Sequence, residues 1–145
     1  MGEARDTLDR MTTALMANDL KTVGECYCEN AVAITPDDGE VNDRTGIVDY
    51  FGKVLQAFPD LHYEYLAKHE SATVAIDEGY FTGTNTGNIS GPDGESIPAT
   101  GRQVRVRECD VVTVDDDGLI REHRFYYDQM EFLGQLGLIP ETATG

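Results

Sequence analysis

Asp128 is the residue of this chain that is best placed to do chemistry. It follows three aromatic residues, Phe125, Tyr126 and Tyr127, at the point where an alternating β-type pattern changes to a helical pattern. A carboxylate at a strand end among aromatic rings loses hydration, which raises its pKa and makes it a stronger base. The pattern therefore indicates a proton-transfer group at Asp128 if a cavity surrounds it.

Asp128 also has a purely structural interpretation. It immediately precedes a helical pattern over residues 129–136, and Asp at the N-cap position stabilises a helix by about 1 kcal/mol. Glu131 stands three residues later, which gives the Asp-x-x-Glu spacing of a capping box. The residues alone leave both interpretations open.

Three neighbours share a predicted strand face with Asp128 because side chains alternate along a strand: Glu122, Arg124 and Tyr126. In a cavity, Tyr126 and Arg124 could stabilise an enolate oxygen. The alternative is an ion pair between Glu122 and Arg124 at the surface, because long charged side chains usually end in water.

The opposite face of the same strand carries Phe125 and Tyr127. These rings would pack on helices or on a second copy of the chain. Because an exposed apolar sheet face needs covering, we expect a homodimer or a higher homo-oligomer.

The elements that must position these residues follow from periodicity. Apolar spacing predicts three N-terminal helices, over residues 3–18, 19–28 and 45–58, the last capped by Thr45 and stopped by Pro59. Strands are predicted over residues 31–35, 61–70, 73–88, 103–114 and 119–127, and a short helix over 129–136 ends at Gly137. Helices followed by a long meander indicate an α+β fold in a single domain, residues 1–145. A bent antiparallel sheet with helices across its concave face would form a cone with an internal pocket.

Composition limits the partners. The formal net charge is -16, which argues against nucleic acid and against anionic membrane surfaces. No run approaches the roughly 18 apolar residues of a membrane helix, and the polar N-terminus lacks a signal-peptide core. We therefore expect a cytoplasmic protein.

Metal and redox motifs are weak. Cys26 and Cys28 form a C-x-C pair, and Cys109 is the third cysteine. The histidines His62 and His69, like His123, stand in no metal-binding spacing with one another, so we expect no metal site. The acidic turns at residues 37–38 and 115–117 are interpreted as solvated hairpin tips, because their spacing does not fit an EF-hand.

Three segments, taken in order, resemble a known family. They are residues 57–61 (AFPDL), residues 81–87 (FTGTNTG) followed by 97–102 (IPATGR), and residues 117–128 (DGLIREHRFYYD) with 135–137 (QLG). Together with the opening helices, the chain is similar to the SnoaL-like polyketide cyclases of the NTF2-like superfamily. The resemblance implies an intramolecular aldol ring closure on an apolar polycyclic carbonyl ester, without metal or cofactor. It implies Asp128 as the general base and acid.

The resemblance also suggests a pocket. Asn85 stands where many relatives carry His, and it is either a polar pocket residue or a strand residue in a Gly-rich and Thr-rich bend. In a cone fold some aromatic residues line the pocket, and we expect Phe51, Phe58, Tyr63 and Phe81 there. The alternatives to a cyclase are an isomerase or hydrolase that uses the same Asp, and a ligand-binding or dimerisation module without chemistry.

Overall fold

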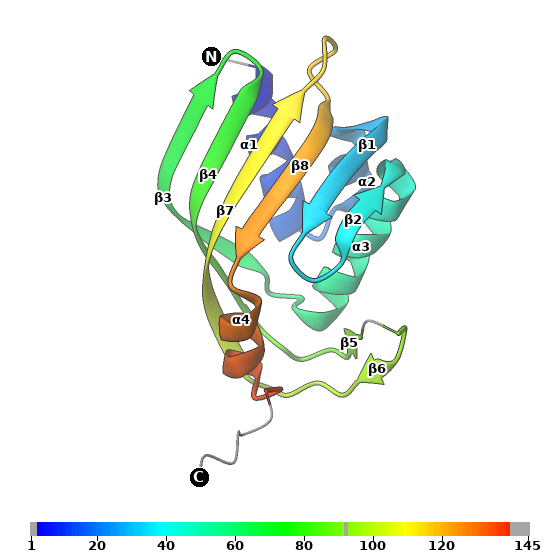
Figure 1. The fold of residues 1–145 in the computed structure, drawn as a ribbon, viewed down its shortest axis with the longest axis vertical. Helices are drawn as coiled ribbons and strands as arrows, with labels where there is room; N and C mark the ends of the chain where they lie inside the picture. The colour runs from blue at the N-terminus through cyan, green and yellow to red at the C-terminus, as the bar shows by residue number, and fades with distance from the viewer. Residues whose placement is uncertain (1–2, 92, 140–145) are drawn as a thin grey trace.

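A curved sheet of six strands forms one wall of the molecule, and helices cover its inner face (Figure 1). The computed structural model describes residues 3–91 and 93–139. The helices are α1 (Glu3–Met16), α2 (Leu20–Glu25), α3 (Asp43–Ala57) and α4 (Gln129–Leu136). In spatial order, the strands of the sheet are β2 (Gly39–Asn42), β1 (Tyr27–Thr35), β8 (Ile120–Tyr127), β7 (Gln103–Val114), β4 (Val74–Thr84) and β3 (His62–Ser71). A separate two-residue pair consists of β5 (Ile89–Ser90) and β6 (Ser96–Ile97).

The core lies between the inner face of the sheet and helices α1 to α3. Leu8, Leu15 and Ile47 of the helices are fully buried there. Burial alternates along β7, because every second side chain faces the helices. The segregation of helices to one face of a curved sheet confirms the predicted α+β fold.

The pairing of β1 with β8 differs from the prediction. The sequence suggested an antiparallel sheet, but β1 runs parallel to β8, with Tyr27 opposite Ile120 and Ile34 opposite Arg124. The sheet is therefore mixed. Alternation of side chains reports which face a residue takes and carries no information about the direction of the neighbouring strand.

The second helix ends earlier than predicted. It stops at Glu25, and Tyr27, which the helical pattern placed inward on that helix, begins β1. The main-chain oxygen of Cys26 accepts a hydrogen bond of 2.8 Å from the N–H of Ile120. This long-range bond to the start of β8 takes the place of a further helical turn.

The third helix begins at Asp43 instead of after Thr45. Asp43 has a φ of 63°, a conformation that Asp tolerates better than most residues. Its side chain accepts a 2.8 Å hydrogen bond from the N–H of Gly46, three residues on. Asp43 therefore satisfies a free donor of the first turn, as the prediction expected of Thr45.

Candidate active site

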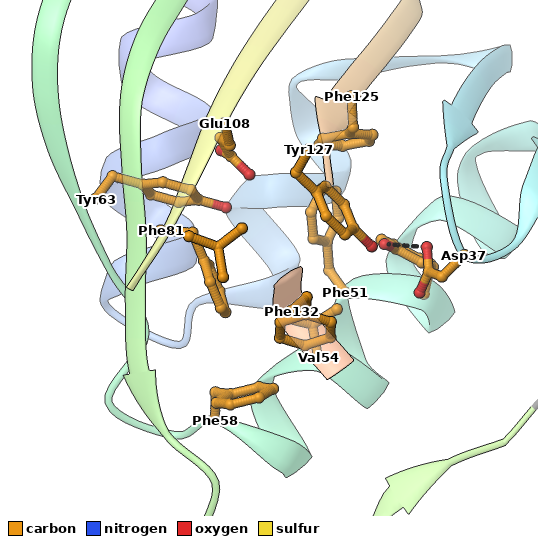
Figure 2. Close-up of a pocket in the computed structure, with 12 residues that line it drawn as sticks. Asp37, Phe51, Val54, Phe58, Tyr63, Phe81, Glu108, Phe125, Tyr127 and Phe132 are labelled. Atoms are coloured by element: carbon orange, nitrogen blue, oxygen red, sulfur yellow. Dashed lines mark hydrogen bonds between the residues drawn. The ribbon is translucent and has the colours of Figure 1, made fainter. Parts of the chain in front are cut away.

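An internal cavity opens between α3, the sheet and α4, and aromatic rings form most of its wall (Figure 2). Its volume is about 80 Å³. The lining residues are Asp37, Tyr50, Phe51, Val54, Phe58, Tyr63, Phe81, Val106, Glu108, Phe125, Tyr127 and Phe132. Such an apolar space excludes water and strengthens the electrostatic effect of the few polar groups that face it.

The four aromatic residues expected in a pocket all line this cavity. Phe58 and Phe81 form an edge-to-face pair with ring centroids 5.4 Å apart, and Phe51 packs on Phe125 at 5.9 Å. The ring of Tyr63 also packs on Phe81, with ring centroids 6.1 Å apart. These contacts hold the rings in a rigid wall.

Glu108 is the carboxyl group on the inner side of the cavity. The alternation of β7 turns it toward the helices, and its side chain points into the cavity beside Tyr63 (Figure 2). Glu108 is 9% exposed, and its Oε1 atom has no hydrogen-bond partner among the described residues. Burial, together with the nearby Asp110, raises the pKa of Glu108 well above its usual value. A carboxyl group with a raised pKa keeps its proton to a higher pH, so Glu108 is suited to donate a hydrogen bond or a proton to a ligand.

Two tyrosines that line the cavity, Tyr63 and Tyr50, keep their hydroxyl protons. Burial and the nearby Glu108 raise the pKa of Tyr63 well above its usual value. Burial and the charge of Asp37 do the same for Tyr50. The hydroxyl of Tyr63 is therefore available to donate a hydrogen bond to a ligand, whereas that of Tyr50 donates to Asp37.

Asp37 supplies the second carboxyl group of the cavity, from the turn between β1 and β2. It faces the cavity across from Glu108 (Figure 2) and accepts a hydrogen bond of 3.0 Å from the hydroxyl of Tyr50. The sequence interpretation of this turn as a solvated hairpin tip was incomplete. The turn residue as a whole is exposed, but its carboxyl group also lines the cavity.

Asp128 lies outside the cavity. It is exposed and caps α4, since its Oδ1 accepts hydrogen bonds from the N–H groups of Met130 at 2.9 Å and Glu131 at 3.2 Å. The capping interpretation is confirmed. A role of Asp128 as a base remains a prediction.

Asp128 also borders an outer depression, a shallow open surface of about 480 Å³. The outer depression is lined by Pro36, Glu78, Arg107, Glu108, Cys109, Phe125, Tyr126, Tyr127, Asp128 and Glu131. Glu108, Phe125 and Tyr127 border both this surface and the cavity, because they belong to the paired strands β7 and β8 that stand between the two spaces.

The side chains of β8 alternate as predicted, and the face that carries Asp128 turns outward. His123 and Phe125 are buried and Tyr127 lines the cavity, whereas Tyr126 is 53% exposed on the other face. Arg124 forms an ion pair with Glu122, as the surface interpretation expected. Asp128 and Tyr126 both border the outer depression, and neither Tyr126 nor Arg124 is among the residues that line the cavity.

Asn85 is a structural residue of the bend after β4. It is fully buried, and its side-chain amide donates to the main-chain oxygens of Ala57 at 3.1 Å and Gly87 at 2.8 Å. Its Oδ1 accepts from the N–H of Thr100 at 2.8 Å and from the hydroxyl of Thr100 at 2.9 Å. With these bonds its side chain is fully used, and Asn85 is not among the residues that line the cavity.

Sequence reasoning missed Glu108 and Asp37. The signal for Glu108 was present, because it and Asp110 interrupt the apolar alternation of Val106 and Val112 on the inner face of β7. An acid at an inward position of an otherwise apolar face indicates a site. For Asp37 the chain offers no such pattern.

Among residues 3–91 and 93–139, no helix is long and apolar enough to cross a membrane. Within the same ranges, no cluster of three or more His, Cys, Asp or Glu side chains has the proximity needed to hold a metal ion.

A curved mixed sheet closed by helices over an aromatic cavity defines an NTF2-like protein. The family model for SnoaL-like polyketide cyclase matches residues 5–136, so the chain belongs to the SnoaL-like polyketide cyclase family. No curated protein matches the sequence significantly.

Solved structures share the fold. A SnoaL-like polyketide cyclase candidate from Jannaschia sp. CCS1 superposes with a TM-score of 0.82 at 16% identity, over 95% of this chain and 94% of that chain. IdmH from Streptomyces antibioticus, described as a candidate polyketide cyclase, gives a TM-score of 0.74 at 24% identity, over 92% and 98% of the two chains. AclR from Streptomyces galilaeus, described as a candidate hydroxylase, gives a TM-score of 0.78 at 22% identity, over 98% of this chain and 85% of that chain.

Proposed function

We propose that this chain is a cofactor-independent enzyme that transfers protons on an apolar carbonyl compound, with aldol-type ring closure as the reaction. The observation that carries the proposal is the presence in one aromatic cavity of a buried carboxyl group with a raised pKa, Glu108, and of a second carboxyl group, Asp37, that belongs to an exposed turn. Two carboxyl groups in unlike environments provide an acid and a base at the same pH.

The division of roles follows from these environments. Asp37 removes a proton from the carbon next to the substrate carbonyl, which leaves an enolate. Glu108 and the hydroxyl of Tyr63 donate hydrogen bonds to the enolate oxygen and disperse its charge. The enolate carbon then attacks a second carbonyl group of the substrate, and the new alkoxide takes back the proton that Asp37 holds. The proton count is unchanged over the cycle.

The size of the cavity limits which part of the substrate reacts inside it. A volume of about 80 Å³ is well below the roughly 300 Å³ at which drug-sized ligand pockets begin. We infer that a single reacting ring enters the cavity and that the rest of a larger polycyclic ester stays outside it.

The test follows hydrogen–deuterium exchange at the acidic carbon of a one-ring β-keto ester in heavy water by NMR. We expect Glu108→Gln and Asp37→Asn each to lower the enzyme-dependent exchange rate by about 100-fold or more. Asp38→Asn is the matched control for Asp37, because it removes the neighbouring acid of the same turn. Unchanged exchange in Glu108→Gln would contradict the proposal.

The same experiment separates the alternatives. Exchange that persists in Asp37→Asn but is lost in Asp128→Ser would make Asp128 the base, as the sequence suggested. Binding of the β-keto ester without exchange in the wild type would favour a ligand-binding protein.

Homodimerisation stays a prediction, and the structure moves it to another surface. Phe125 and Tyr127 face inward, whereas Tyr126 and Met130 are the exposed apolar side chains near the end of β8. A dimer would cover them. Sedimentation of the wild type at micromolar concentration should give a species of about twice the chain mass, and a monomer would contradict it.

A further inference from the structure

We propose that Asp110 is a positioning residue that, packed beside His123, keeps a proton on Glu108 and so maintains Glu108 as the acid of the cavity. The inference rests on the proposed role of Glu108. It assigns a purpose to a buried polar cluster that lies behind the cavity wall and that the reaction scheme does not use.

The strand geometry places the two carboxyl groups together. Glu108 and Asp110 are successive inward residues of β7, and both are buried. On the neighbouring strand β4, Gly79 lies opposite Glu108, and Asp77 lies opposite Asp110. Three acids therefore occupy one small region of the inner face, and the glycine lets the main chain of β3 approach β4 closely beside them.

His123 lies beside Asp110, and neither Nε2 of its ring nor Oδ1 of Asp110 forms a hydrogen bond among the described residues. Its ring is fully buried and stacks on Phe125, with ring centroids 3.9 Å apart. The Nδ1 atom lies 2.7 Å from the hydroxyl of Tyr27, and the Nε2 atom lies 3.4 Å from Oδ1 of Asp110. Because both ring nitrogens face a partner and the ring is stacked, the imidazole cannot turn without breaking contacts.

The buried guanidinium group of Arg5 already forms ion pairs with two other acids. Arg5 of α1 lies with its Nη2 atom 2.7 Å from Oδ1 of Asp77 and 2.6 Å from Oδ1 of Asp9. Asp110 has the His123 ring as its partner, whereas no basic side chain forms an ion pair with Glu108 among the described residues. Adjacent carboxylates in a low-dielectric interior repel each other strongly, so one of the pair keeps its proton. By this count Glu108 is the acid that remains neutral.

The other groups around Glu108 support this count. Burial first, and then the neighbouring Asp110, raise the pKa of Glu108. The titratable or charged groups that face the cluster from the elements packed around it are Arg5 of α1, Tyr27 of β1, Tyr50 of α3, Tyr63 and Tyr65 of β3, Asp77 of β4, Tyr127 of β8 and Asp37 of the β1–β2 turn. Burial raises the pKa of each tyrosine, so they stay neutral and act as donors.

The test is a carboxyl titration that does not depend on turnover. Protein labelled with ¹³C at Glu carboxyl carbons is titrated by NMR, and the Glu108 signal is assigned by its loss in Glu108→Gln. In Asp110→Asn the Glu108 midpoint should fall by about one pH unit or more, because the neighbouring charge is gone. Glu78→Gln, which removes an acid from the outer face of β4, is the matched control and should leave the Glu108 midpoint in place.

A second measurement covers the case in which Asp110→Asn does not fold. Neutron diffraction of the wild-type protein at pD 7 should show one deuteron on the Glu108–Asp110 pair. An unchanged Glu108 midpoint in folded Asp110→Asn overturns the proposal, as does a pair that carries no deuteron or two. Loss of the exchange reaction in Glu108→Gln tests the proposed function separately, because neither the titration nor the neutron map uses a substrate.

Discussion

The side-chain amide of Gln135 pairs with both main-chain polar groups of Arg105. Its Oε1 accepts from the Arg105 N–H at 2.7 Å, and its Nε2 donates to the Arg105 oxygen at 3.0 Å. Strand β8 ends at Tyr127 and does not reach this part of β7, so the glutamine of α4 satisfies the edge that a strand would have covered. This contact seats α4 so that Phe132 closes the cavity.

We expect Asp128 to contribute to the stability of the protein as the N-cap of α4. Asp128→Ala should lower the free energy of unfolding by about 1 kcal/mol, because two N–H groups lose their acceptor, whereas Asp128→Ser should stay within about 0.5 kcal/mol of the wild type. Urea unfolding measures both. Equal stability of the alanine and serine variants would show that the cap contributes nothing measurable.

Glu108 should give the stability a distinct pH dependence. Its pKa in the folded protein is raised above the usual 4.5, so the unfolded chain loses this proton first as the pH rises. Its favourable contribution is therefore complete below about pH 4.5 and is lost as the pH rises through the folded pKa.

Glu108→Gln carries no such proton. The unfolding free energy of this variant minus that of the wild type should increase above about pH 4.5, by up to about 1.4 kcal/mol per pH unit. Urea unfolding between pH 4 and pH 9 at constant salt provides the curve. A difference that stays flat, or that decreases with pH, would contradict a raised pKa at Glu108.

Asn85 should be one of the most sensitive polar positions. Asn85→Ala removes four hydrogen bonds to Ala57, Gly87 and Thr100 from a fully buried side chain and leaves a cavity, and we expect a loss of about 3 kcal/mol in unfolding free energy. Asn88→Ala is the matched control, because Asn88 is exposed and donates only to the hydroxyl of Ser96. A loss below about 1 kcal/mol at Asn85 would show that the bend is held by other contacts.

Two glycines should respond in opposite directions. A Cβ atom at Gly79 would lie 2.0 Å from the main-chain oxygen of Glu64, so Gly79→Ala should cost about 1–3 kcal/mol by forcing β3 and β4 apart. A Cβ at Gly52 of α3 would meet only Leu20 Cδ1 at 3.7 Å. Gly52→Ala should therefore stabilise the protein by about 0.5–1 kcal/mol through helix propensity, and thermal melting distinguishes the two signs.

The fold could be predicted largely because its signals are local. Apolar spacing located the helices near their observed positions, and the Asp-Gly turn before β8 follows from known turn preferences. The parallel pairing of β1 with β8 could not be predicted, since Tyr27 and Ile120 meet only through tertiary structure. The same contact explains why the second helix ended sooner than its pattern suggested.

The candidate site was predictable in its apolar part but not in its polar part. Phe51 and Phe81 line the cavity as expected, because large rings at inward positions have few other places to go. Asp37 reaches the cavity from a turn, and only the three-dimensional course of the β1–β2 hairpin brings it there. Asp128 caps α4, as one of its two sequence interpretations expected. Glu108, the inward acid of β7, was not predicted.

The parallel contact between β1 and β8 also constrains how the chain is made. Strand β1 leaves the ribosome early in synthesis. The residues from Tyr27 to Ile34 pair with Ile120 to Arg124, which are synthesised some ninety positions later. Until those arrive, one edge of β1 has no strand to pair with, and such an edge is prone to pair with other chains. Slow synthesis, or a pause before residue 120, should therefore favour aggregation over folding, and a chaperone that shields strand edges would act during this interval.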